Sequence, residues 1–221
     1  MIWLASFPRS GSTFFRIVLD EVYGIESGTF HRETSYPVDD DYTDYQVVKT
    51  HLLPSELTPE DASIPAVYLV RDGRDCMISL AHYRQQLLAP ESDFYGNVLE
   101  AIDAAEGSHF GGWSRHVRTW CERASLVIHF EHLIADPIGC VEQLRPYIDL
   151  PSPKTNRLPQ FTDLRSKDFK YGSGMQHGFG EQQRKHWRES KFRAGRSGGW
   201  RDELPEPLHL RFLRRHGHEL A

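Results

Sequence analysis

Residues 2–16 of the chain, IWLASFPRSGSTFFR, decide the fold. Residues 2–7 form a short apolar run that stops at Pro8, a pattern typical of a buried strand. A loop with one glycine follows at residues 9–13, and from Phe14 onward apolar residues recur with helical spacing. A strand, a tight loop and a helix start form an anion-binding site, because the free N–H groups of the first helical turn and the helix dipole favour negative charge.

The side chains of this loop extend the anion site. Arg9 adds a fixed positive charge, and Ser10, Ser12 and Thr13 add hydroxyl donors, so we expect a phosphate-like ligand. A Walker A loop would need a Lys directly after its last glycine, and a dinucleotide fingerprint would need three spaced glycines. Here no Lys follows Gly11, and it is the only glycine of the loop. On the loop alone, an ordinary helix capped by Ser12 or Thr13 remains the alternative.

Strand-like and helix-like segments alternate along the rest of the chain. We expect strands at residues 2–7, 45–50, 66–70 and 125–130. We expect helices at residues 12–23, 74–88, 113–123, 137–148 and 205–216. This alternation predicts an α/β fold, a three-layer sandwich with a central parallel sheet and helices on both faces. Ligands of such sheets bind beyond the carboxyl ends of the strands, where Arg9, His51 and Arg71 would meet in one crevice.

Composition limits the possible classes of function. A chain of 221 residues is expected to form one domain, residues 1–221. Its net charge of −5 argues against nucleic acid as a partner, which needs a basic surface. Residues 184–201 are nevertheless rich in Lys and Arg, and a local basic cluster suits a small polyanion such as a nucleotide bisphosphate.

Cysteine usage and hydropathy bear on the compartment. The three cysteines have no disulfide or metal-clip spacing, so we expect no metal site. The chain starts directly in its first predicted strand, and no apolar run approaches the roughly 20 residues that span a bilayer. We therefore expect a cytoplasmic protein without a membrane span.

The whole pattern resembles the PAPS-dependent sulfotransferases, whose phosphosulfate loop reads roughly Y-P-K-S-G-T-T-W (PAPS is 3′-phosphoadenosine 5′-phosphosulfate). The loop at residues 9–13 is the first match. YQVVKTHLLPSEL at 45–57 resembles the family strand that ends in K-T-H. VYLVRDGRDCMISLAHY at 67–83 resembles the segment for the 3′-phosphate, in which an Arg precedes a Ser by eight residues, as Arg71 precedes Ser79.

Three later segments continue the resemblance in the family's order. HFGGWSRHVRTW at 109–120 resembles G-S-W-x-H-V-x-x-W, and FEHLIADP at 130–137 resembles Y-E-D-L-x-x-D-P. FRAGRSGGWRDELP at 192–205 resembles the late R-K-G-x-x-G-x-W-K element. The resemblance implies a P-loop-containing nucleotide hydrolase-like fold, PAPS as cofactor with PAP (3′-phosphoadenosine 5′-phosphate) as product, no metal, and transfer of a sulfuryl group to a hydroxyl or amine.

The resemblance also implies roles for individual residues. His51, at the end of the K-T-H strand, would be the general base, since an imidazole with a near-neutral pKa suits proton abstraction. Arg9 and Lys49 would stabilise charge on the leaving nucleotide. The residues expected to bind the cofactor are Arg9, Ser10, Gly11, Ser12, Thr13, Phe14, Arg71, Ser79, Phe130, Arg193, Ala194 and Gly195.

Four of these positions depart from the family pattern. Arg9 stands where most members have Lys, and because Arg does not give up a proton we expect it to bind oxygens and not to act as an acid. Ala194 replaces a Lys, which removes one cofactor contact. Phe14 replaces a Trp and Phe130 a Tyr beside the adenine, where stacking is worth about 1–3 kcal/mol per base in nucleic-acid systems. Ordinary core packing is the alternative for both rings.

The acceptor side is where the resemblance is least specific. It implies that His82, Phe110, Trp113 and His116 line the acceptor pocket, although aromatic residues at helical spacing also suit a core. The chain is shorter than typical members before its K-T-H strand, so we expect an open site for a small molecule, a glycan or a natural product. Residues 152–180 are expected to form a long ordered loop over the site, with disorder as the alternative.

Two other functions stay open at this point. A nucleotide-binding small-molecule kinase would share the strand–loop–helix start, but it needs the missing Lys and a carboxylate for magnesium. A non-catalytic protein that binds PAP or PAPS would keep Arg71 and Ser79, whereas the presence of His51 and Lys49 favours catalysis.

Overall fold

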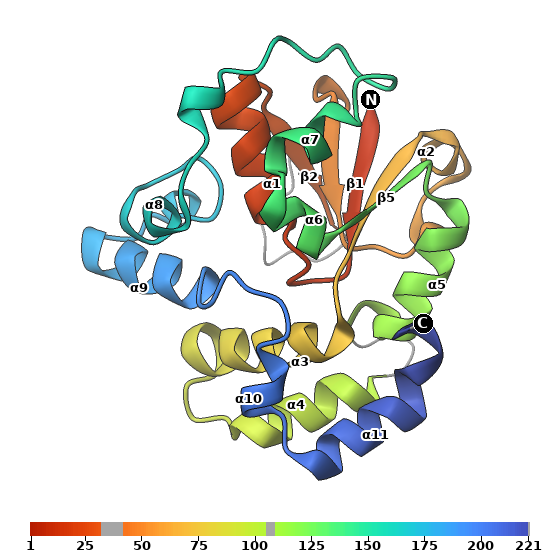
Figure 1. The fold of residues 1–221 in the computed structure, drawn as a ribbon, viewed down its shortest axis with the longest axis vertical. Coiled ribbons are helices and arrows are strands. Elements are labelled where there is room, and N and C mark those ends of the chain that lie inside the picture. Colours follow the sequence, from red (N-terminus) through yellow and green to blue (C-terminus); the bar gives the residue numbers. More distant parts are fainter. Residues whose placement is uncertain (32–41, 105–108, 221) are drawn as a thin grey trace.

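The computed structural model describes residues 1–31, 42–104 and 109–220 (Figure 1). Its centre is a sheet of five parallel strands in the order β2-β3-β1-β4-β5. The strands are β1 (Ile2–Ser6), β2 (Ser27–Phe30), β3 (Val47–Thr50), β4 (Ala66–Val70) and β5 (Leu126–His129). The central strand β1 pairs with β3 on one side and with β4 on the other. The predicted parallel sheet is therefore confirmed.

Strand β2 is the one strand of the sheet that the sequence pattern did not predict. Its residues, SGTF, include a Ser, a Gly and a Thr and lack an apolar run. It forms at the edge of the sheet, where Gly28 pairs with Val48 of β3. A Cβ at Gly28 would lie 2.7 Å from the Tyr45 ring, so the close approach of that ring requires a glycine.

Helices cover both faces of the sheet and extend beyond its carboxyl edge. They are α1 (Ser12–Val18), α2 (Pro59–Ser63), α3 (Gly73–Tyr83), α4 (Phe94–Asp103), α5 (Trp113–Arg123), α6 (Phe130–Ala135), α7 (Pro137–Glu142), α8 (Phe161–Ser166), α9 (Glu181–Lys191), α10 (Trp200–Glu203) and α11 (Glu206–His216). The predicted helix at 113–123 is confirmed to the residue, and that at 205–216 to within one.

Three predicted helices end earlier or change their winding. α1 stops at Val18 and continues as a π-helical turn to Tyr23, and α3 stops at Tyr83 and continues in the same way to Leu88. The helix predicted over 137–148 ends at Glu142 and gives way to turns. The helices that were not predicted are α2, α4, α6, α8, α9 and α10.

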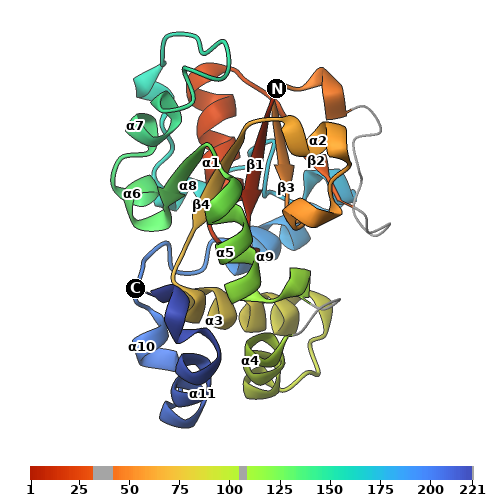
Figure 2. The same cartoon turned by 90° about the vertical axis from the view of Figure 1, so that its right-hand side faces the viewer.

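The side chains of β1 show how the three layers form. Ile2 and Leu4 belong to one buried cluster that includes residues of α1 and α7. Trp3 and Ala5 point to the other face, into a second cluster with residues of α3, α4 and α5. This alternation is the period of a strand that is buried on both faces. Figures 1 and 2 show α1, α6 and α7 on one side of the sheet, with α5 on the other.

The segment 152–180 is ordered, and it is not a loop throughout. It contains α8 and two single 3-10 turns. It is attached to the sheet by Tyr171, whose hydroxyl accepts a hydrogen bond of 2.7 Å from the Ser27 N–H. The alternative of plain disorder is therefore wrong. No helix within residues 1–31, 42–104 and 109–220 combines the length and the apolar character needed to cross a bilayer.

Candidate functional site

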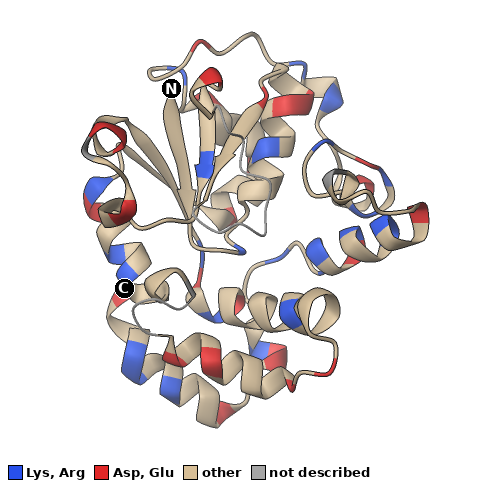
Figure 3. Ribbon diagram, turned by 180° about the vertical axis from the view of Figure 1, so that it is seen from behind, with Lys and Arg blue, Asp and Glu red and all other residues tan. Residues whose placement is uncertain are grey.

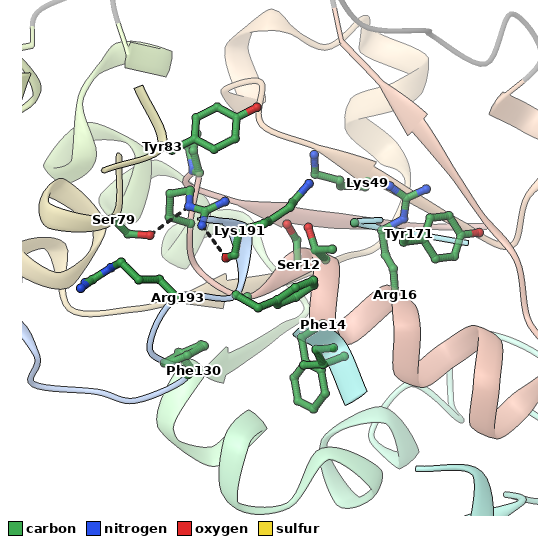
Figure 4. Close-up of a pocket in the computed structure, with 18 of the residues that line it drawn as sticks. Ser12, Phe14, Arg16, Lys49, Ser79, Tyr83, Phe130, Tyr171, Lys191 and Arg193 are labelled. Carbon is green, nitrogen blue, oxygen red and sulfur yellow. Dashed lines mark hydrogen bonds between the residues drawn. The ribbon is translucent and has the colours of Figure 1, made fainter. Parts of the chain in front are cut away.

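A cavity of about 1390 Å³ opens at the carboxyl ends of the strands. The loop before α1, the end of β3, the helix α3 and the start of α6 form its walls, and the segments around residues 158–172 and 187–195 complete them. Figure 4 shows side chains from these separate elements converging on one space. The position agrees with the expected crevice beyond the strand ends, and Arg9, His51 and Arg71 all line it.

The loop before α1 has an unusual backbone. Arg9 has φ 72° and Gly11 has φ 97°, so two residues of this short loop are left-handed. A Cβ on Gly11 would lie 2.9 Å from a ring carbon of Phe130, which explains the glycine. A non-glycine residue with positive φ is uncommon, and such residues gather at ligand sites. Ser12 and Thr13 begin α1 and line the cavity, as expected.

Ser10 does not face the cavity, and this prediction is wrong. Its side chain is only 1% exposed, and its hydroxyl lies 3.6 Å from the Cys76 sulfur inside the protein. The left-handed backbone at Arg9 and Gly11 turns the residue between them inward. Ser10 therefore fixes the loop to α3 and offers no hydroxyl to a ligand.

The Arg9 side chain is held by two hydrogen bonds. Its Nε donates to the Ser79 hydroxyl at 2.9 Å, and its Nη2 donates to the Lys191 carbonyl at 2.7 Å. The polar Ser79 side chain of α3 thus finds its hydrogen-bond partner in Arg9. Burial lowers the pKa of Arg9 to about 10, helped by the nearby charges of Arg71 and Arg193. The guanidinium is thus still charged at neutral pH.

Two lysines complete a basic cluster with Arg9 on the wall of the cavity. Burial lowers the pKa of Lys191 to about 7, and the charges of Arg9 and Arg16 lower it further in the same direction. The pKa of Lys49 falls well below its usual value from burial and from Arg16, Lys191 and Arg9. No Asp or Glu lines the cavity within the described ranges. Buried positive charges without a carboxylate are stabilised by an anionic ligand.

His51 lies at the end of β3, beside this cluster. Its Nδ1 is 2.6 Å from the Ser6 carbonyl oxygen, a contact that requires a proton on Nδ1. Nε2 is then the unprotonated nitrogen of the neutral ring, able to accept a proton. Burial and the neighbouring Lys49 place the pKa of His51 well below its ordinary 6.5. The expectation of a near-neutral pKa is therefore wrong for the protein alone, because burial, and after it the nearby charge of Lys49, disfavours the protonated ring.

A second cationic group lies on the opposite side of the loop. Arg71 donates from Nη1 to the Arg9 carbonyl at 3.0 Å and from Nη2 to the Arg196 carbonyl at 2.9 Å. Its guanidinium stacks 4.2 Å from the centre of the Phe130 ring, and its buried Nε has no hydrogen-bond partner. Arg193 lines the same part of the cavity and pairs with Glu203 at 2.7 Å.

The remaining predicted cofactor residues also line the cavity. Ala194 and Gly195 do so beside Arg193, and a Cβ at Gly195 would lie 2.3 Å from a ring carbon of Phe161. Phe14 and Phe130 both face the cavity as well as packing on the core (Figure 4). The two interpretations of these rings are thus compatible.

Only one of the four predicted acceptor residues lines the cavity. Phe110 does so, with its ring centre 5.5 Å from that of His51. His82 is turned away from the cavity, and its Nε2 lies 2.5 Å from Oε2 of Glu203. Trp113 is 1% exposed and packs on Phe212, because α5 directs its apolar face into the core.

His116, the fourth, is fully buried. Its Nε2 donates to the His51 carbonyl at 3.2 Å, and its Nδ1 accepts from the Tyr68 hydroxyl at 3.0 Å. Burial lowers the pKa of His116 to about 3, so it is a neutral structural residue that supports the backbone of His51.

Three basic residues of the late segment, Arg184, Arg188 and Arg196, form ion pairs outside the cavity. Figure 3 shows several basic positions along α9. Arg184 and Arg188 both pair with Asp168, and neither lines the cavity, so they do not belong to its basic cluster. Lys191, at the end of α9, instead reaches into the cavity (Figure 4).

Several residues that line the cavity on the side of β2 were not predicted from the sequence. These are Arg16, Ser27, Thr29, His31, Lys170 and Tyr171. Arg16 was detectable as the single charged residue on the otherwise apolar start of α1. Tyr171 was not, because its place depends on the path of the segment 152–180. Within the described part of the chain, no group of three or more His, Cys, Asp or Glu is arranged to hold a metal ion.

Comparisons with known proteins identify the family. The model of the sulfotransferase domain matches residues 19–219, so the chain belongs to the sulfotransferase domain family. Sulfotransferase 1A1 of Canis lupus familiaris is 24% identical over 192 residues, which cover 73% of this chain and 64% of that protein. Sulfotransferase 1 family member D1 of Mus musculus is 22% identical over 243 residues, which cover 96% of this chain and 80% of that protein. The chain thus spans just under two thirds of the length of the canine relative.

Solved structures support the same fold. Mouse sulfotransferase SULT7A1 complexed with PAP aligns with a TM-score of 0.68 and 18% identity, over 97% of this chain and 83% of that one. Retinol dehydratase in complex with androsterone and inactive cofactor PAP aligns with a TM-score of 0.63 and 16% identity, over 100% of this chain and 80% of that one. The sequence-based assignment of family and fold is confirmed.

Asp75 offers a test of how the cavity is held together. Its buried carboxylate accepts hydrogen bonds from the N–H groups of Gly198 at 2.7 Å and Trp200 at 2.9 Å, and so ties the late segment to α3. Replacing Asp75 by Ala is expected to lower the free energy of unfolding by about 2–4 kcal/mol, because both amides lose a charged acceptor. Urea denaturation measures the change.

The matched control is Asp202→Ala. Asp202 forms an exposed ion pair with Arg196, so its loss is expected to cost less than about 1 kcal/mol. An equal effect of the two substitutions would show that Asp75 does not hold the segment.

Proposed function

We propose that the protein transfers a sulfuryl group from PAPS to a hydroxyl or amine of an acceptor. The observation that carries this proposal is the presence of two cationic groups in one cavity, on either side of the glycine loop. Arg9, Lys49 and Lys191 form one group, and Arg71 with Arg193 forms the other. A nucleotide with phosphate groups at both 5′ and 3′ positions matches such a pair of sites.

The residues fit PAPS by their chemistry. The N–H groups at the start of α1 and the hydroxyls of Ser12 and Thr13 suit the oxygens of the 5′-phosphosulfate. The Arg71 side chain, with a buried Nε that lacks a partner, suits the 3′-phosphate. Phe14 and Phe130 offer ring faces for the adenine. PAPS when bound would supply the sulfuryl group and a leaving nucleotide, PAP.

In this proposal His51 acts on the acceptor. The Ser6 carbonyl holds the proton on Nδ1, which leaves Nε2 to take the proton from the acceptor hydroxyl or amine. Arg9, Lys49 and Lys191 stabilise the negative charge that develops on the departing nucleotide. Arg9 is fixed by Ser79 and by the Lys191 carbonyl, so little reorganisation is needed when that charge appears.

A kinase is less well supported. The loop has no Lys after Gly11, and the cavity has no carboxylate for magnesium within the described residues. Retinol dehydratase is in complex with retinol in one of the similar structures and with androsterone in another, and both are small molecules. As part of the proposal, we expect a small-molecule acceptor for this chain.

The experiment that tests the proposal compares thermal shifts with PAP, AMP and ATP in the absence of magnesium. PAP at one hundred times its Kd is expected to add about 2.7 kcal/mol of stability, and AMP much less, because AMP lacks the 3′-phosphate. Arg71→Ala should reduce the PAP shift toward that of AMP. Equal shifts from PAP and AMP would remove the assignment of Arg71 and Arg193.

Substituting the proposed base separates binding from chemistry. His51→Ala is expected to lower turnover about 10²–10⁴-fold with radiolabelled PAPS and an acceptor that the wild type uses, because general-base catalysis is lost. Its Kd for PAP, measured by calorimetry, should hardly change. His186→Ala, an exposed histidine of α9, is the control and should keep full turnover. Near-normal turnover of His51→Ala would exclude His51 as the base.

The lowered pKa of Lys191 predicts proton uptake when PAP binds. In the protein alone this pKa is about 7, and a bound polyanion raises it toward the ordinary 10.5. At pH values between about 7 and 10.5, Lys191 is therefore protonated in a larger fraction of the complex than of the free protein. Binding of PAP then takes up protons, so PAP affinity should fall as pH rises from 7 to 10. Calorimetry at pH 8.5 in buffers of different ionisation enthalpy measures the uptake. Lys191→Met should reduce it by up to one proton, and an unchanged uptake would show that Lys191 does not face the ligand.

A further inference from the structure

Glu203 of α10 connects a cavity-lining arginine to helix α3. Its Oε1 accepts a hydrogen bond of 2.7 Å from Nη1 of Arg193, and its Oε2 lies 2.5 Å from Nε2 of His82 on α3. Arg193 lines the cavity, whereas the other two side chains do not. The carboxylate therefore contacts the arginine from outside the cavity.

The Glu203 side chain is ionised and has a partner at each oxygen. Burial raises the pKa of its carboxyl group, but hydrogen bonds from His82 and Arg193 outweigh that effect and hold the pKa below its usual value. An ionised carboxylate only accepts hydrogen bonds, so Nε2 of His82 carries the proton of their contact. Since each oxygen has its own donor, rotation of the carboxylate would break a hydrogen bond.

The surroundings of this carboxylate are fixed as well. His82 packs its ring on Phe94 of α4, with the ring centres 4.6 Å apart. Helix α10 is tied to α3 by Asp75, whose carboxylate accepts from the Trp200 N–H at 2.9 Å. Packing and hydrogen bonds thus fix the position of the Glu203 carboxylate relative to α3.

Arg193 lies on the irregular segment between α9 and α10, so no helix or strand fixes its side chain. Figure 4 shows it at the same end of the cavity as Phe130. An arginine side chain has many rotamers, and this freedom is lost when the guanidinium binds a ligand. The hydrogen bond to Glu203 uses one of five N–H donors and removes much of that freedom beforehand, which leaves other donors for a phosphate.

Glu203 has two opposite effects on an anionic ligand. Its negative charge repels a phosphate, and its hydrogen bond holds the guanidinium ready for one. The repulsion is reduced because Glu203 does not line the cavity and because Coulomb energy falls with distance. Fixing one side chain with many rotamers is worth about two- to tenfold in affinity, so we expect positioning to prevail.

We propose that Glu203 is a positioning residue that strengthens the preference of the site for nucleotides with a 3′-phosphate, and that it acts by holding the Arg193 guanidinium toward that phosphate. It touches neither the nucleotide nor the acceptor. This inference rests on the proposed function, because binding of PAPS is what brings a 3′-phosphate to Arg193.

The test compares the affinities for PAP and AMP, because their ratio measures how well the 3′-phosphate is recognised. Calorimetry on the full chain gives both Kd values. Glu203→Ala is expected to lower the preference for PAP about three- to tenfold, because Arg193 is no longer held. Glu203→Asp keeps the charge but shortens the side chain by one methylene, so it should lower the preference as well. Asp202→Ala removes the same charge from the neighbouring position of α10, and as the control it should keep the full preference.

An Arg193→Met variant shows whether Glu203 acts through the arginine. This substitution by itself is expected to lower the preference for PAP about tenfold or more, since a charge-assisted hydrogen bond to the phosphate is lost. Adding Glu203→Ala to it should lower the preference no further. A merely structural role of Glu203 would instead lower the preference by the same factor with and without Arg193.

The proposal is overturned by an unchanged or increased preference for PAP in a folded Glu203→Ala variant. An equal loss in the presence and absence of Arg193 also overturns it. If Glu203→Ala does not fold, Glu203→Asp decides by the same criteria. Equal affinities of the wild type for PAP and AMP are a separate result, since they contradict the assignment of the 3′-phosphate site in the proposed function itself.

Discussion

The burial of several positively charged side chains around one cavity is the constraint on which the site depends. Burial lowers the pKa of Arg9, Lys49 and Lys191, and the charges of Arg9 and Arg16 lower it further at both lysines, in a cavity that no described carboxylate lines. Such an arrangement reduces the stability of the protein alone, and it persists because the surrounding structure fixes it. The unfavourable free energy of these buried charges is offset when an anion binds, since each cation then lies beside an opposite charge in a region of low dielectric constant.

The backbone of the glycine loop connects this charge to the fold. A left-handed Arg9 lets its carbonyl accept from Arg71 while its guanidinium reaches Ser79 and the Lys191 carbonyl. One residue thus bonds to the strand end of β4, to α3 and to the end of α9. The two cationic groups are therefore held relative to each other by the protein, and a rigid spacing of charges discriminates between nucleotides better than charge alone.

The sequence predicted the parallel sheet and the loop of residues 9–13 because both follow from local patterns. It also predicted that Arg9, His51 and Arg71 meet, since strand ends share one edge of a parallel sheet. It failed where a side chain's direction depends on tertiary packing. Ser10 turns inward because of the φ values on either side of it, and Trp113 and His116 occupy the buried face of an amphipathic α5. Lys191 and Tyr171 belong to segments whose paths no local pattern encodes.

The hydrogen bond between Arg9 and the Lys191 carbonyl joins residues from opposite ends of the chain. The cavity is therefore a product of long-range closure, and its formation must follow the entropically costly meeting of distant segments. During synthesis the glycine loop emerges long before its cationic partners from α9 and the segment behind it. A nascent chain accordingly acquires its full affinity for the ligand only after α9 has been made, so that ligand binding cannot guide the earlier pairing of the strands.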